Sequence, residues 1–258
     1  MGRIYPLFSS SKGNSIYIGS KTSGILIDAG VSCTRLFKAL ELNEIEPSAV
    51  RAVFVTHEHS DHIGGIKILT KRLRIPVFAQ SYTLEGLYDK EYICSSGDEM
   101  KCSICIGDME ISCFNTPHDT QESCGYKICF EDGKSCAVCT DLGHVTEEVE
   151  QALLGTDAVL IEANYDENML RTGPYPAYLK SRIRSKYGHL SNSDSGAFAA
   201  RLIESGTTRL ILGHLSQENN TPQTADNTVC SCLSDYKRNS DYLLSVAPVE
   251  TSGGFISF

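Results

Sequence analysis

The stretch Thr56-His57-Glu58-His59-Ser60-Asp61-His62-Ile63-Gly64-Gly65 decides how the rest of the chain is interpreted. It places three of the seven histidines within six positions, together with two carboxylates. The apolar run at 52–55 before it predicts a buried strand, and the helical spacing of apolar residues after it predicts a helix. Imidazole and carboxylate groups are ligands that suit Zn²⁺, Mn²⁺ or Fe. We therefore predict a metal site on a strand-to-helix turn.

Two alternative interpretations of this turn fit it less well. The zincin pattern His-Glu-x-x-His requires a histidine where Asp61 stands. A helix cap that happens to be rich in histidine needs one hydrogen-bond acceptor and not three imidazoles. The residues favour a metal site of another pattern.

Length and composition indicate one α/β protein of the cytoplasm. At 258 residues the chain is long enough for one large domain or two small ones, and it shows no linker, so we expect a single domain over residues 1–258. No apolar run approaches a membrane span, and the first residues do not form a signal peptide. The eleven cysteines then indicate reduced thiols and a cytoplasmic location, with no membrane partner. The net charge of −9 argues mildly against a general coating of nucleic acid.

Two Cys-x-x-Cys pairs, Cys102/Cys105 and Cys136/Cys139, raise the alternative of a structural zinc site. Both pairs lie in segments that we predict to be strands. Residues three apart on a strand face opposite sides of the sheet, so neither pair is expected to chelate an ion.

A basic segment interrupts this acidic chain. Between residues 171 and 186 there are five cations and no acid, namely Arg171, Lys180, Arg182, Arg184 and Lys186. On a helix, Lys180/Arg184 and Arg182/Lys186 would be like-charged neighbours, which is unfavourable and suggests an anionic partner. A solvated basic face is the alternative.

The pattern His-x-His-x-Asp-His followed by Gly-Gly resembles the metallo-β-lactamase superfamily. The resemblance implies an α/β fold in four layers, an αββα sandwich, with a dinuclear metal site. Matched motif by motif, it implies that His57, His59 and His118 hold one ion, that Asp61, His62 and His214 hold the other, and that Asp141 bridges them. Asp28, at the end of a predicted strand, would support the ligand loop from behind.

Further motifs resemble the branch of YycJ/WalJ-like exonucleases. They are Ser11-Lys12-Gly13-Asn14-Ser15, Thr140-Asp141-Leu142-Gly143, Gly173-Pro174-Tyr175-Pro176, Gly188-His189-Leu190-Ser191-Asn192 and Gly213-His214-Leu215-Ser216. This resemblance implies a 5′→3′ DNA exonuclease that uses two divalent ions (Zn²⁺ or Mn²⁺, or Fe) and the hydroxide that bridges them. Asn14 would support the ligands, as Asp28 does. Tyr165 departs from the pattern, because relatives often carry a histidine there.

His189 follows directly on the basic segment. Asp61 and His189 are the predicted catalytic residues, and the predicted substrate-binding residues are Lys180, Arg182, Arg184, Lys186, His189 and Ser191. The imidazole of His189 would hold a phosphate or protonate the departing alkoxide. A buried structural histidine is the alternative for this residue.

The expected partner is DNA with a 5′ end. The alternative function on the same metals is that of a small-molecule cyclic phosphodiesterase or an RNA-processing nuclease, similar to PhnP or RNase Z. A metal-bearing interaction protein is a third alternative, which the complete ligand set argues against. The oligomeric state is left open.

Overall fold

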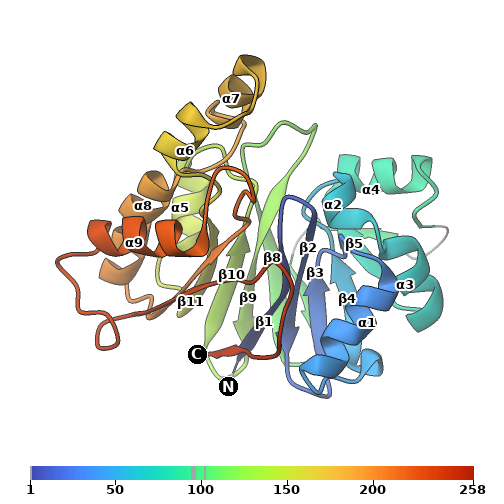
Figure 1. Ribbon diagram of the computed structural model, residues 1–258. Helices are drawn as coiled ribbons and strands as arrows, with labels where there is room; N and C mark the ends of the chain where they lie inside the picture. The colour runs from blue at the N-terminus through green and yellow to red at the C-terminus, as the bar shows by residue number, and fades with distance from the viewer. Residues whose placement is uncertain (1, 94–96, 102) are drawn as a thin grey trace.

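Two β-sheets pack face to face between layers of helices in the computed structural model, which describes residues 2–93, 97–101 and 103–258 (Figure 1). The strand order is β14-β1-β2-β3-β4-β5-β6 in the first sheet and β13-β12-β11-β10-β9-β8-β7 in the second. Helices α1 to α4 lie outside the first sheet, and α5, α8 and α9 lie outside the second (Figure 1). The predicted four-layer αββα sandwich is confirmed.

The first half of the sandwich is built almost entirely from the first hundred residues. Its strands are β1 (Arg3–Ser10), β2 (Gly13–Gly19), β3 (Gly24–Ile27), β4 (Val50–Phe54), β5 (Val77–Ala79), β6 (Gly97–Glu99) and β14 (Ile256–Ser257). Its helices are α1 (Cys33–Leu42), the 3-10 helix η1 (Pro47–Ala49), α2 (Ser60–Ile63), α3 (Ile66–Leu73) and α4 (Ser81–Asp89).

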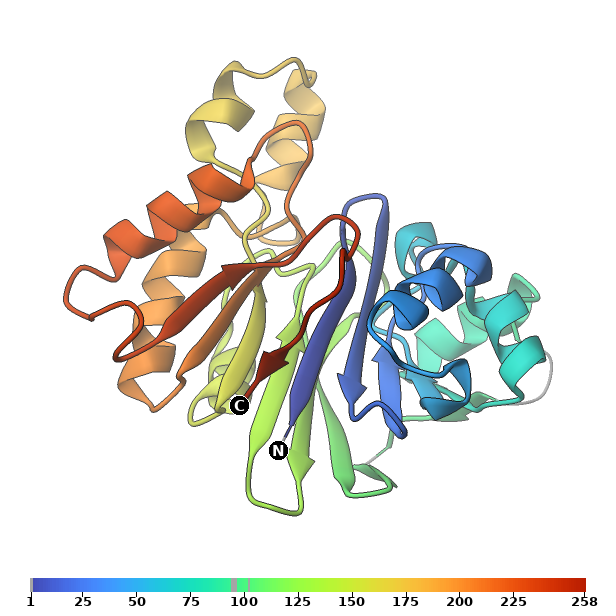
Figure 2. The same cartoon turned by 60° about the horizontal axis from the view of Figure 1, so that its bottom comes forward.

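The second half contains the remaining elements. Its strands are β7 (Ile104–Ile106), β8 (Met109–Asn115), β9 (Cys124–Phe130), β10 (Ser135–Cys139), β11 (Ala158–Glu162), β12 (Arg209–Gly213) and β13 (Leu243–Val246). Its helices are α5 (Glu147–Leu153), α6 (Glu167–Thr172), α7 (Ala177–Ile183), α8 (Asn192–Glu204) and α9 (Pro222–Cys232). Turned by 60°, the same fold shows α6 and α7 standing together at one end of this half (Figure 2).

Residues on the two faces of the central strands supply two different cores. In β4, Ala52 and Phe54 belong to the core between the two sheets, whereas Val50 and Val53 belong to the core under α1 and α3. A strand buried on both faces is apolar throughout, which explains the continuous apolar run before the histidine motif. The predicted strand at 52–55 therefore corresponds to β4.

One edge of the sandwich collects the functional loops. Strands β3, β4 and β5 are parallel to one another, as are β10, β11 and β12, so the carboxyl ends of each group share an edge. The segments that follow β3, β4, β8, β10, β11 and β12 form what we call the loop edge. Parallel strands in α/β folds place binding sites outside their carboxyl ends, so the loop edge is where the site is expected.

The basic segment forms less helix than predicted. Helix α7 ends at Ile183, Arg184 is its C-cap, and Lys186 lies in the turn beyond. The expected helical pairing of Arg182 with Lys186 is therefore wrong. The chain turns back here because the amide of His189 donates to the Ile183 carbonyl oxygen at 2.9 Å, which ends the helix.

The cysteine pairs have different outcomes. Cys136 belongs to the core between the sheets and Cys139 to the core under α5 and α8, so the two thiols face opposite sides of β10, as predicted. Cys102 lies outside the described residues, so the Cys102/Cys105 pair stays a prediction.

Among the described residues, no helix combines the length and the hydropathy that crossing a membrane requires.

Candidate metal centre

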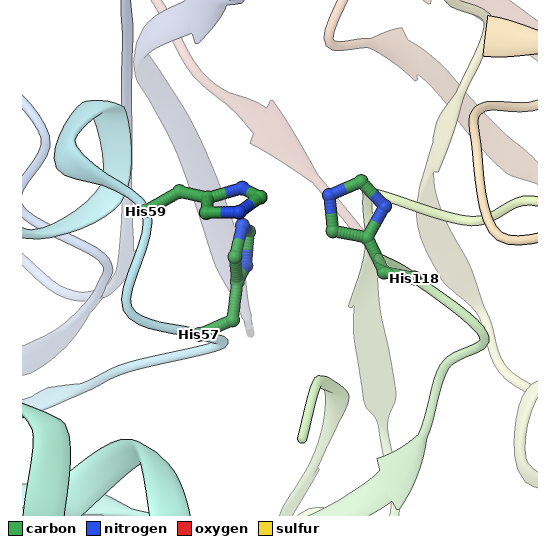
Figure 3. Close-up of side chains that lie close together, drawn as sticks. All are labelled: His57, His59 and His118. Carbon is green, nitrogen blue, oxygen red and sulfur yellow. The ribbon is translucent and has the colours of Figure 1, made fainter. Parts of the chain in front are cut away.

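Three histidines from two loops meet at the loop edge. His57 and His59 follow β4, and His118 follows β8. Figure 3 shows their rings turned towards one another, and one ligand nitrogen from each lies within 4.8 Å of the other two. The structure thus brings together the trio that was predicted for the first ion.

A second group lies beside the first. Ligand atoms of Asp61, His62 and His214 also fall within 4.8 Å of one another. Asp141 belongs to one cluster with His57 and His62 and to another with His214, so its carboxylate lies between the two groups. This is the position expected for a ligand shared by two ions.

Buried polar atoms without partners test whether metal ions fit here. Among the described residues, the Nε2 atoms of His57 and His214 and the Oδ2 atom of Asp141 are buried and have no hydrogen-bond partner. Such atoms are costly to leave unpaired inside a protein. Lone pairs of imidazole and carboxylate that converge without donors are the donor set that divalent transition metals take. The residues therefore fit two metal ions.

The electrostatics of the two groups differ. Burial and the charges of neighbouring histidines hold the pKa of His57 well below its usual range, which favours the neutral form that binds metal. Burial also lowers the pKa of His62, but the carboxylates of Asp28, Asp141 and Asp61 outweigh it and raise this pKa to about 10. A site whose carboxylates attract protons this strongly also attracts divalent cations.

Backbone conformation at three strand ends is unusual. Asp28, Asp141 and His214 have φ values of 62°, 55° and 55°, in the left-handed region that residues other than glycine rarely adopt. Each residue directly follows or closely follows a strand at the loop edge. Strained backbone of this kind persists where the surrounding structure holds it, commonly at functional sites.

Asp28 and Asn14 contact the candidate ligands. One carboxylate oxygen of Asp28 accepts hydrogen bonds from Nδ1 of His62 at 2.7 Å and from the Thr56 hydroxyl at 2.9 Å. This bond leaves Nε2 of His62 as the nitrogen that faces the centre. The Asn14 amide nitrogen lies 3.3 Å from Oδ2 of Asp61 and 3.1 Å from Nε2 of His62.

Glu162 is a residue of the candidate site that the sequence analysis missed. It ends strand β11 and is fully buried. Its Oε1 accepts hydrogen bonds from Nδ1 of His189 at 2.7 Å and of His214 at 2.9 Å, and its Oε2 accepts from the amide of Leu142 at 2.7 Å. Burial would raise the pKa of Glu162, but its two histidine partners lower it to about 2. A glutamate ending an otherwise apolar strand was the available signal.

Replacing Glu162 with glutamine is expected to weaken metal binding. In either orientation the glutamine NH₂ group would face hydrogen-bond donors, either the two imidazoles or the backbone amides of Leu142 and Leu190, so the contacts that orient His214 would be weakened. Partners of this kind typically contribute about 10- to 100-fold to metal affinity. Competition with a chelator measures the loss, and the exposed Glu204→Gln on α8 is the matched control. Equal metal affinity in the two variants would contradict the role assigned to Glu162.

His189 lies beside this centre but outside the predicted ligand set. Its Nδ1 is committed to Glu162, its side chain is 20% exposed, and its Nδ1 lies 3.8 Å from the Asp141 carboxylate. Nε2 is therefore the nitrogen available to a bound molecule. His189 precedes helix α8 by two residues of irregular chain and does not lie in the helix.

The predicted substrate-binding residues divide into two groups. Arg184 and Lys186 are exposed, and Arg182 is exposed but pairs with Asp119, the neighbour of the ligand His118. Lys180 is half-buried and donates to the carbonyl oxygens of Arg171 at 2.9 Å and Gly173 at 2.7 Å, so its ammonium already holds α6 to α7.

Ser191 requires a correction. It is 1% exposed, and its hydroxyl accepts from the amide of Asp194 at 3.1 Å as the N-cap of α8. A buried capping hydroxyl has no free face for a substrate, so Ser191 supports the helix instead.

Tyr165, the departure from the family pattern, packs with Leu170 and Ile183 in a small core that joins α6 and α7.

Comparison with known proteins agrees with this geometry. The chain matches the Beta-lactamase superfamily domain over residues 24–215. The exodeoxyribonuclease WalJ of Streptococcus pneumoniae is 34% identical over 233 residues, which cover 88% of this chain and 86% of that protein. The exodeoxyribonuclease YycJ of Bacillus anthracis is 35% identical over 240 residues, which cover 89% of this chain and 88% of that protein.

A solved structure shows the same architecture. The metallo-β-lactamase fold protein YhfI from Bacillus subtilis superposes with a TM-score of 0.74 at 14% identity, and the match covers 97% of this chain and 98% of YhfI. The similarity of fold at so low an identity agrees with the packing described above. With a domain match over residues 24–215 and relatives aligned to 88% of its length, the chain belongs to the metallo-β-lactamase superfamily and is a metal-dependent hydrolase.

Proposed function

We propose that this chain is an exodeoxyribonuclease that hydrolyses phosphodiester bonds from the 5′ end of DNA in the 5′→3′ direction. The observation that carries the proposal is the convergence of all seven predicted ligand side chains at the loop edge of a chain 34–35% identical to exodeoxyribonucleases. The 5′→3′ direction rests on the sequence resemblance, and the experiment below tests it.

The candidate ligand residues fall into two groups, one for each metal ion. His57, His59 and His118 would hold one ion, Asp61, His62 and His214 the other, and Asp141 both. These residues would hold ions whose chemistry is to polarise a phosphodiester and to lower the pKa of water. The Asp61 side chain, at 25% exposure, is more open than those of Asp141 or His214, so it would also accept a hydrogen bond from water.

His189 would act on the substrate directly. Glu162 holds its Nδ1–H, which fixes the orientation of the ring and leaves Nε2 free. From there the imidazole would donate to a non-bridging phosphate oxygen or give its proton to the departing alkoxide. Arg184 and Lys186 would contact phosphates further along the strand, which positions DNA without reading its sequence.

Labelled substrates test the proposal. Purified protein with Mn²⁺ or Zn²⁺ is incubated with DNA labelled at the 5′ or the 3′ end, with RNA of the same sequence, and with bis-p-nitrophenyl phosphate. We expect early release of the 5′ label in very short products and a ladder of shortening products from the 3′-labelled strand. Degradation of RNA alone, or of the small ester alone, would contradict the proposal and favour the alternative functions.

Salt dependence measures the contribution of the exposed cations. The double variant Arg184→Ala/Lys186→Ala is expected to bind DNA more weakly and to flatten the dependence of log K on log salt. Each lost contact with a single strand reduces that slope by about 0.7, because one fewer counterion is released. Lys38→Ala, an exposed cation on α1, is the control. A slope equal to that of the control would show that these cations do not touch DNA.

A further inference from the structure

One exposed tyrosine lies on the basic segment and a second follows directly after it. Tyr178 is 76% exposed and Tyr187 is 60% exposed, the two highest values among the large apolar side chains that the structure describes. Aromatic rings that gain nothing from the core of their own protein are available to a partner. Their positions on the chain indicate what that partner is.

Tyr178 lies on helix α7, which also carries Arg182. It precedes Arg182 by four residues, so the two side chains share one face of the helix. Arg182 pairs with Asp119, and Nε2 of the ligand His118 lies 3.3 Å from the same Asp119 carboxylate. Four residues of helix span about 6 Å along its axis, so Tyr178 lies about 6 Å from Arg182 in that direction. The Arg182 side chain is held beside the candidate ligand His118 through Asp119.

Tyr187 lies on the turn that joins α7 to His189. The carbonyl oxygen of the next residue, Gly188, accepts a hydrogen bond from Nδ1 of His118 at 3.1 Å. The turn is tightly held, because a Cβ added to Gly188 would lie 2.2 Å from the Ile183 carbonyl oxygen. A Cβ on Gly143 would likewise lie 2.2 Å from the Lys186 carbonyl oxygen. The backbone on both sides of Tyr187 is thus closely packed, and the next residue along the chain contacts the candidate ligand His118.

The segment of chain that carries both rings has a positive charge. No acidic residue occurs from Arg171 to Ser193, and the exposed Arg184 and Lys186 lie between the two tyrosines in sequence. Exposed rings interleaved with cations are the arrangement that binds single-stranded nucleic acid, in which bases stack on the rings while phosphates pair with the cations. An acidic protein partner would use the charge but would not require two solvent-exposed rings beside a phosphodiesterase centre.

We propose that Tyr178 and Tyr187 stack on unpaired bases of the DNA strand whose end enters the metal centre. The inference rests on the proposed function and adds the form of the substrate. Bases within a duplex are covered on both faces by their neighbours, so two rings on this surface require bases that have left the duplex. The segment next to the centre therefore takes single-stranded DNA.

A fluorescent base measures the stacking without hydrolysis. The metal-loaded protein is mixed with a single strand that carries phosphorothioate linkages, to resist cleavage, and 2-aminopurine near its 5′ end. We expect quenching on binding to the unchanged protein and to the Tyr178→Phe and Tyr187→Phe variants, which keep the rings. Tyr178→Ala and Tyr187→Ala are each expected to relieve the quenching and to bind about 5- to 150-fold more weakly. Tyr88→Ala, on the distant helix α4, is the control.

Several results would overturn the stacking. The proposal is wrong if the alanine variants bind DNA and quench its fluorescence as the control does. It is also wrong if the phenylalanine variants lose as much DNA affinity and quenching as the alanine variants. Alanine variants that change the oligomeric state but not DNA binding would identify the rings as a protein interface instead. Degradation of unmodified DNA is followed in parallel. If the unchanged protein degrades DNA without quenching, only the stacking fails; if it neither binds nor degrades DNA, the proposed function fails with it.

Discussion

Replacement of Asp61 by alanine is expected to reduce the bound metal from two equivalents to one and to stop hydrolysis, while the protein stays folded. Asp61 lies in the first turn of the four-residue helix α2, and its side chain is 25% exposed. Its hydrogen bond to Asn14 is long, at 3.3 Å. Removal of such a bond costs about 1 kcal/mol or less, so the fold does not depend on this carboxylate.

Two measurements separate metal loss from unfolding. Elemental analysis counts the metal, and the melting temperature is compared between metal-free proteins, because a bound ion would itself stabilise the folded state. The melting temperature is expected to change by less than about 4 °C. Asp89→Ala, at the exposed end of α4, is the matched control. Full activity after loss of one ion would contradict the two-metal site.

The candidate ligands were predictable because each lies next to a strand that the local sequence pattern predicts. His57 follows an apolar strand, Asp141 follows a hairpin strand, and His214 follows another apolar strand, and such strands have few alternative structures. The superfamily pattern then related the three positions to one another. Local pattern and family motif together predicted the seven candidate ligand side chains that the structure gathers at the loop edge, but not Glu162, whose carboxylate lies in one group with Asp141, His189 and His214.

The contribution of Glu162 could not be predicted in the same way. Its partners come from three different loops: Leu142, the neighbours His189 and Leu190, and His214. The sequence shows only a charged residue at the end of a buried strand, and its role depends on contacts between segments far apart in the chain. Non-local contacts of this kind are absent from spacing and periodicity.

Two predictions, for Ser191 and for the end of the basic helix, failed because a local hydrogen bond in the structure competes with the predicted role. Ser191 is part of a family-like motif, but a serine directly before a helix is also an N-cap, and in the structure the cap occupies its hydroxyl. The basic segment was predicted to continue as a helix through Lys186, whereas the tight turn before His189 ends it at Ile183. Boundaries set by tertiary hydrogen bonds are the least visible feature of a sequence.

His189→Ala is expected to keep both metal ions and the melting temperature but to lower turnover on DNA by about two to four orders of magnitude if His189 is the general acid. The structure supports retention of the fold, since Glu162 keeps its bonds to His214, Leu142 and Leu190 when the imidazole is removed. The matched control is His144→Ala. The exposed imidazole of His144 bonds to the Lys186 carbonyl at 3.0 Å and so supports the same turn from outside the centre.

A change of leaving group distinguishes the two roles open to His189. The alkoxide of DNA needs a proton when it departs, whereas the p-nitrophenolate of bis-p-nitrophenyl phosphate leaves without one. If His189 is the acid, His189→Ala lowers turnover on DNA severely and on the nitrophenyl ester only slightly. If His189 instead donates a hydrogen bond to a non-bridging oxygen, both substrates lose turnover to a similar degree, because both present that oxygen. Turnover on DNA at the level of His144→Ala, or unfolding of His189→Ala, would show that the imidazole serves the structure alone.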